Sequence, residues 1–196
     1  MQYYIYSLVC FLLPGTVWLI WNKGMIADKA YKVRHIIWIY IYLFYGYLAV
    51  QEAAGIGTIW DLIAYGKLDN SINLIPFSSE GAMTYILNII MFMPLGFLLP
   101  LIWKNFRNAK KVVLMGFLMS LAIEICQLFN LRATDIDDLM MNTLGTLVGY
   151  CCWKVFSLIF RNAGTKCVEM KKSEPVIYMF GGILGLFLLY NWRVFN

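Results

Sequence analysis

Six long apolar runs constrain this chain more than any other feature of its sequence. Each run is close to the length of about 20 mostly apolar residues that a helix needs to cross a bilayer. Together the runs take up more than half of the 196 residues, and they cover roughly 3–21, 36–54, 86–103, 112–129, 139–160 and 176–194. We therefore predict an all-α, polytopic integral membrane bundle of about six transmembrane helices, with no separate soluble domain.

The distribution of basic residues predicts how these helices are oriented. Thirteen of the 16 Lys and Arg residues lie in three segments between the runs, namely 22–35, 104–111 and 154–175. Segments 55–85 and 130–138 hold one basic residue each. Cytoplasmic loops carry the excess of Lys and Arg, so we expect the basic segments in the cytoplasm and both termini on the extracytoplasmic side. The first run is expected to be a retained helix, because basic residues follow it rather than precede it as in a signal peptide.

The net charge of +5 does not require a nucleic-acid partner. The basic residues flank the runs, where anionic lipid head groups attract each Lys or Arg by about 1 kcal/mol. The chain has one histidine, His35, whereas a histidine-based zinc site needs several histidine ligands. The five cysteines fall mostly within apolar runs. We assign no residues to a metal site, and the sequence identifies no cofactor.

Two polar side chains interrupt the fourth run near its outer end. Glu124 and Gln127 are three residues apart and therefore share one helix face. A carboxyl group within a membrane span is costly and usually faces a cavity or a partner, which marks it as a candidate functional group. The structural alternative is a Glu that only ties helices together by hydrogen bonding.

The turn after this run, residues 130–138, is rich in charge. Asp135 followed by Asp138 resembles an acidic capping box at the start of the fifth helix. Asn142 lies four residues after Asp138 on the same helix face, whereas Asp137 lies off that face. We therefore expect replacement of Asp137 to have a milder effect than replacement of Asp138.

The predicted topology brings eight polar residues to one level just below the outer membrane surface. These are Asn73, Asn88, Glu124, Gln127, Arg132, Asp135, Asp138 and Asn142. Such a cluster could bind a cation, an anionic head group through Arg132, or a sugar through its amides. Oxygen-rich ligands of this kind would suit Ca²⁺ or Mg²⁺ better than zinc. The residues alone do not choose among these ligands.

Five motifs in this region, taken in order, resemble the VanZ-like family. They are Asn73-Leu74-Ile75-Pro76-Phe77; the stretch from Asn88 to Phe97 with Pro94 and Gly96; Ser120 with Glu124 and Gln127; Arg132; and Asp135-Ile136-Asp137-Asp138 with Asn142, Gly145 and Gly149. The resemblance covers about 72–150. It implies a bacterial membrane protein of a family named for low-level resistance to teicoplanin, a lipoglycopeptide.

The resemblance supplies a phenotype rather than a reaction, so two functions stay open. In the first, the protein lowers susceptibility to lipoglycopeptides by binding or altering a cell-envelope component at the outer face. In the second, it is a membrane enzyme acting on a lipid-linked or amphiphilic substrate, since a buried carboxyl can be tuned for proton transfer. Glu124 would then be the acid or base, supported by Asp135 and Asp138. The other five cluster residues are candidates for substrate binding in either case.

The chain is predicted to divide into three consecutive segments, all within one membrane-embedded bundle. These are 1–71, with two helices and an outer interfacial segment; 72–150, the VanZ-like core with three helices; and 151–196, with a cytoplasmic loop and the last helix. We expect the bacterial cell membrane as the location and the bilayer, a lipid-linked envelope component or a lipoglycopeptide as partners. The glycine pairs Gly145/Gly149 and Gly181/Gly185 permit close helix approach, and we expect them to pack helices within one chain rather than to form an oligomer.

Overall fold

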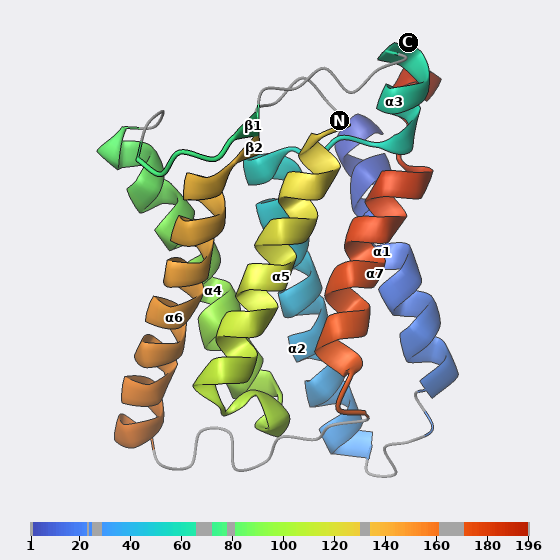
Figure 1. Cartoon of the computed structure of the whole chain (residues 1–196). Helices are drawn as coiled ribbons and strands as arrows, with labels where there is room; N and C mark the ends of the chain where they lie inside the picture. The colour runs from blue at the N-terminus through green and yellow to red at the C-terminus, as the bar shows by residue number, and fades with distance from the viewer. Residues whose placement is uncertain are drawn as a thin grey trace.

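The computed structural model describes residues 2–22, 24, 29–65, 72–77, 81–129, 134–160 and 171–195. The helices in this described part are α1 (Gln2–Asn22), α2 (Lys29–Tyr47), α3 (Ile59–Tyr65), α4 (Ala82–Ile102), α5 (Ala109–Gln127), α6 (Ile136–Ile159) and α7 (Glu174–Leu189). All but α3 are long and run side by side (Figure 1). Each of these long helices corresponds to one of the apolar runs, so the predicted helical bundle is confirmed.

Three of the helical stretches in the described part are long and apolar enough to cross a membrane. They are Gln2–Asn22, Lys32–Gln51 and Ala82–Ile102, and α7 is a shorter apolar helix. Many apolar side chains of these helices point outward, including Val9, Ile41 and Ile90. An outward apolar surface on helices is what a hydrocarbon solvent requires. These features indicate a membrane protein, while the number of spans stays a prediction.

The second helix is longer than its apolar run and changes form at its C-terminal end. α2 begins at Lys29 rather than near residue 36, because a helix can extend beyond the bilayer into charged sequence. It continues into a π-helical segment, Leu48–Ala54, that ends at Gly55 with a positive φ of 64°. π-Helical turns are rare and occur often at functional sites. The hydropathy pattern gave no sign of this segment.

The described chain also contains one element that the all-α prediction omits. Strand β1 (Ile72–Asn73) pairs in parallel with β2 (Thr134–Asp135), so that Asn73 lies opposite Asp135. The pair holds the segment before α4 against the start of α6. It is too short to show a period-2 pattern in the sequence.

Glycines allow α4 and α6 to approach until their backbones touch. A Cβ atom added at Gly145 would lie 2.3 Å from the Ile89 carbonyl oxygen, and one at Gly149 would lie 2.0 Å from that of Met93. α1 and α7 approach in the same way, since a Cβ at Gly185 would lie 2.3 Å from the Cys10 carbonyl oxygen. Gly145, Gly149 and Gly185 therefore lie at close helix contacts within the chain, whereas Gly181 meets α1 only at an ordinary van der Waals distance.

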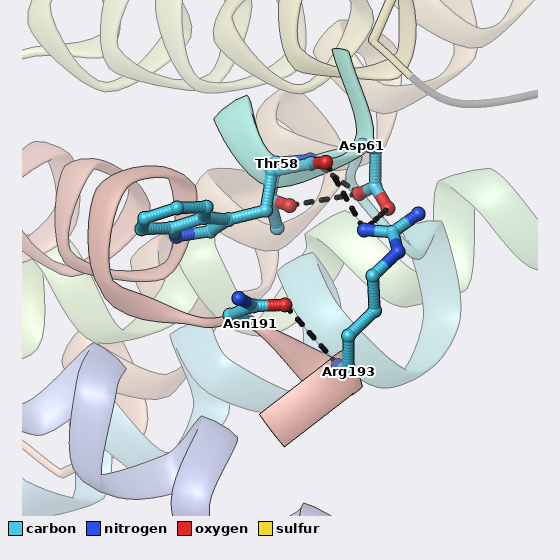
Figure 2. A network of polar contacts seen from close by, with 5 residues as sticks. Thr58, Asp61, Asn191 and Arg193 are labelled. Carbon is cyan, nitrogen blue, oxygen red and sulfur yellow. Dashed lines mark hydrogen bonds and ion pairs between the residues drawn. The ribbon is translucent and has the colours of Figure 1, made fainter. Parts of the chain in front are cut away.

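The short helix α3 is fixed to the C-terminal segment rather than free. Thr58 and Asp61 cap its start, because Asp61 Oδ2 accepts hydrogen bonds from the backbone N–H and the hydroxyl of Thr58, both at 2.8 Å. Arg193 Nη1 lies 3.4 Å from Asp61 Oδ1 and donates to the Trp60 carbonyl (Figure 2). The C-terminal segment therefore anchors α3 through Arg193.

Cysteine labelling can test the predicted orientation of the bundle. Leu74, next to β1 and before α4, and Lys104, just after α4, are both exposed. In a cysteine-free background, we expect Leu74→Cys to react with an impermeant maleimide added to intact cells, and Lys104→Cys to react only after permeabilisation. Labelling of Lys104→Cys in intact cells would show that the orientation is the reverse of the predicted one, with the polar cluster at the inner face.

Candidate functional site

A cavity of about 690 Å³ lies between α4, α5, α6 and the π-helical segment. Five of the eight residues predicted from the sequence line it: Asn88, Glu124, Gln127, Asp138 and Asn142. The remaining lining residues are mostly apolar: Ala53, Ala54, Thr84, Leu87, Ile90, Met91 and Ile123. The volume is in the range of pockets that bind small molecules or head groups.

Helix α5 contributes a buried polar face to this cavity. Ser120, Glu124 and Gln127 follow at helical spacing, and Glu124 is only 4% exposed. Glu124 Oε2 accepts a hydrogen bond of 3.2 Å from the Asp135 N–H. Gln127 Nε2 donates to the Ala54 carbonyl at 3.0 Å, so the π-helical segment is tied to α5 at the cavity wall.

Helix α6 contributes the two polar side chains opposite. Asp138 accepts a hydrogen bond from Asn88 Nδ2, which ties α6 to α4. Asn142 lies one turn further along, is 2% exposed, and donates through Nδ2 to Ser120 Oγ at 2.9 Å. Its Oδ1 has no hydrogen-bond partner in the described part of the chain. A buried amide with one unpaired end costs free energy unless a ligand or water completes it.

Asn73 and Asp135 do not line the cavity but hold its outer edge. Asp135 is the N-cap of α6, and its side chain accepts from the Asp137 N–H at 2.9 Å. Asn73 Nδ2 donates to Asp135 Oδ2 at 3.0 Å across the β1–β2 pair. Their role in this geometry is support, through the Asp135 N–H that holds Glu124. Arg132, the eighth predicted residue, lies outside the described residues.

Asp137 has a structural role that the sequence did not indicate. It lies off the cavity face, as predicted, but it is fully buried. Both of its carboxylate oxygens accept from the Phe77 N–H at 2.9 Å, and Oδ2 also accepts from the Tyr85 hydroxyl at 2.9 Å. Phe77 has a φ of 62°, which is unfavourable for an aromatic residue. Asp137 therefore fixes a strained turn onto α6, and the expectation of a mild effect does not fit this geometry.

We expect Asp137→Asn to destabilise the fold. An Asn side chain keeps one acceptor oxygen and places an NH₂ group against the Phe77 and Tyr85 donors. Loss of hydrogen bonds to a charged acceptor costs about 1.5–3 kcal/mol. Thermal unfolding in detergent should show a lower midpoint than wild type, with a smaller decrease for Tyr85→Phe, which removes only one donor. An unchanged midpoint for Asp137→Asn would rule out the anchoring role.

A second buried polar cluster lies at the opposite end of the bundle, and the sequence did not reveal it. Glu174, fully buried at the start of α7, accepts from Trp103 Nε1 at 3.0 Å and lies 2.8 Å from His35 Nε2. The Tyr178 hydroxyl donates to the same carboxylate at 3.2 Å. Because these partners use both oxygens of Glu174, the cluster ties α2, the end of α4 and α7 together.

Comparisons with known proteins extend the resemblance seen in the motifs. The chain matches the family described as VanZ/LLP1 over residues 5–157. Protein VanZ of Enterococcus faecium is 34% identical over 134 residues, which are 67% of this chain and 77% of that protein. No solved structure matches the chain. The family match begins well before residue 72, so α1 and α2 share in the similarity together with the cavity helices.

Proposed function

Because the chain belongs to the VanZ/LLP1 family, we propose that it is a multi-pass bacterial membrane protein that lowers susceptibility to lipoglycopeptides such as teicoplanin. It does so by binding or altering a component of the cell envelope in the cavity between α4, α5 and α6. The family similarity supports the resistance phenotype, and the cavity is the proposed site at which the envelope component is bound or altered.

The observation that carries this proposal is the amphipathic lining of the cavity. Its polar side chains are buried, as Glu124 and Asn142 are, whereas the α4 side chains at its edge are apolar and exposed. Leu87 is 56% exposed and Ile90 is 54% exposed. In a bilayer these side chains would face lipid. An amphiphilic ligand could therefore enter the cavity laterally from the bilayer, with its polar part towards α5 and α6. Such a shape suits an amphiphile better than a fully water-soluble molecule.

The charge distribution supports an outer-face location for this event. The cavity is lined by residues near the starts of α4 and α6 and the end of α5, whereas Lys104 follows the other end of α4 and Lys110 and Lys111 lie in the first turn of α5. Under the positive-inside rule the basic end is cytoplasmic. The cavity then opens close to the outer leaflet, where a lipoglycopeptide and its envelope targets meet.

The proposal is tested by expressing the chain in a teicoplanin-susceptible Gram-positive host. We expect a higher inhibitory concentration and less surface-bound fluorescent teicoplanin than in cells with the empty vector. A derivative of the same glycopeptide without its acyl chain is the matched control, and its activity should change little. Equal protection against both compounds would place the effect on the peptide core, and no protection would refute the proposal.

The enzyme alternative is favoured by one specific feature: two carboxyl side chains, Glu124 on α5 and Asp138 on α6, both line the cavity. A pair of carboxyl groups in different environments can divide the roles of acid and base. Comparison of lipid extracts from cells with wild-type chain and with Glu124→Gln distinguishes the two functions. A lipid species that changes only with wild-type chain indicates catalysis, whereas identical extracts with a difference in resistance indicate binding.

A further inference from the structure

The polar wall of the cavity points to a specific ligand class. We propose that it binds the primary ammonium group of an amphiphile, with the ammonium at Glu124, Asp138 and Asn142 and the apolar part along α4. This inference rests on the proposed function, because it names the ligand of the same cavity. The ammonium could belong to a phospholipid head group or to an amino sugar, and the two sources share this chemistry.

The hydrogen-bonding state of the wall favours a donor ligand. Each lining amide directs its nitrogen at a protein acceptor: Asn88 at Asp138, Gln127 at Ala54 and Asn142 at Ser120. Among the described residues the Glu124 carboxylate accepts one hydrogen bond, at Oε2, although a carboxylate can accept about four. Asn142 Oδ1 adds an acceptor with no partner in the described part of the chain. The capacity left on this wall is mainly for accepting hydrogen bonds.

The charge of the wall favours a cation. Two of the lining residues, Glu124 and Asp138, are acidic, and none of the described lining residues is Lys, Arg or His. A carboxylate in a low-dielectric site is costly unless a counter-charge accompanies it. An ammonium group supplies that charge at Glu124, and its three N–H donors can be shared among Glu124, Asp138 and Asn142.

The donor set fits an ammonium better than a divalent metal ion. Ca²⁺ requires six to eight oxygen ligands and Mg²⁺ near-ideal octahedral geometry. The described residues contain no group of three or more His, Cys, Asp or Glu placed to hold a metal ion. In addition, the cavity of about 690 Å³ is far larger than an ion and has an apolar side at Leu87 and Ile90. These features accommodate a head group with an attached chain.

Ligand-induced stabilisation of the purified full chain in a neutral maltoside detergent tests the inference. Short-chain phosphatidylethanolamine is compared with phosphatidylcholine of equal chain length, which keeps the phosphate but replaces three N–H donors by methyl groups. Octyl 2-amino-2-deoxyglucoside is compared with octyl glucoside. We expect saturable increases in the unfolding midpoint with the ammonium member of a pair and at least about tenfold weaker binding of its partner. The pair that responds identifies the source.

Variants connect the binding to the named residues. Asn142→Leu, which keeps the side-chain size but removes the amide, should weaken ammonium binding by about tenfold, and Glu124→Gln by more. Glu124→Asp keeps the charge and should keep the preference for ammonium over trimethylammonium. Thr143→Val is the matched control on α6, because Thr143 does not line the cavity and its hydroxyl donates to the Leu139 carbonyl. This control should bind as wild type does.

Several outcomes would overturn the inference. Equal responses to phosphatidylethanolamine and phosphatidylcholine would rule out recognition of the ammonium group. A stronger response to phosphatidylglycerol would indicate an anion site. Stabilisation by MgCl₂ alone would indicate a metal site. If resistance persists in cells while purified protein shows no ammonium preference, only the ligand class is wrong. If ammonium binding is clear but expression gives no resistance, the proposed function is wrong instead.

Discussion

Replacement of Glu124 by Gln is expected to abolish the resistance phenotype while leaving membrane expression and thermal stability close to wild type. The structural part of the role of Glu124 is one hydrogen bond, accepted by Oε2 from the Asp135 N–H. A Gln side chain has the same length and keeps one acceptor oxygen for this bond. It neither titrates nor carries charge, so it cannot transfer a proton or pair with a cation.

The measurement combines the inhibitory concentration of teicoplanin, the amount of chain in the membrane fraction, and the unfolding midpoint in detergent. Asp138→Asn should behave as Glu124→Gln does, because an Asn oxygen can still accept from Asn88 but the charge is lost. Thr143→Val, off the cavity, should retain full resistance. Full resistance with Glu124→Gln would rule out both the catalytic and the ammonium-binding role of Glu124. The Glu124 side chain would then serve only in helix packing.

Helical periodicity and chain topology were sufficient to predict much of the candidate site. Glu124 with Gln127, and Asp138 with Asn142, share helix faces by spacing alone, and alternating spans bring both faces to one end of the bundle. The structure places all four, together with Asn88, on one cavity.

Contacts between residues distant in sequence could not be predicted in the same way. Asp137 and Phe77 are 60 residues apart, and His35 and Glu174 are 139 apart. No local pattern links such pairs, because each depends on how helices pack rather than on the spacing within one helix. The contact between Gln127 and the Ala54 carbonyl could not be predicted either. This contact depends on a π-helical turn that neither hydropathy nor helix propensity indicates.

Introduction of one methyl group at the α4–α6 crossing is expected to have the largest effect on stability. In Gly149→Ala the new Cβ would lie 2.0 Å from the Met93 carbonyl oxygen and 2.8 Å from its carbon, so two helix backbones must separate. Overpacking in a close-packed interior costs about 1–3 kcal/mol, and more where backbone must move. Separation of α4 from α6 also moves Asn88 away from Asp138, so the cavity wall should be lost with the fold.

Two other glycines provide matched controls for this prediction. Gly181 also belongs to a pair at four-residue spacing within a helix, but a Cβ there meets only Pro14 Cβ at 3.4 Å. Gly81, the N-cap of α4, has nothing within 4 Å of an added Cβ. Ala is favoured over Gly inside a helix by about 1 kcal/mol, so Gly181→Ala should unfold at or slightly above the wild-type midpoint. Because Gly149→Ala has the same intrinsic advantage, the difference between the midpoints of Gly149→Ala and Gly181→Ala measures the cost of the helix contact. Wild-type stability of Gly149→Ala would show that α4 and α6 are not in backbone contact, and that the cavity between them has a different shape.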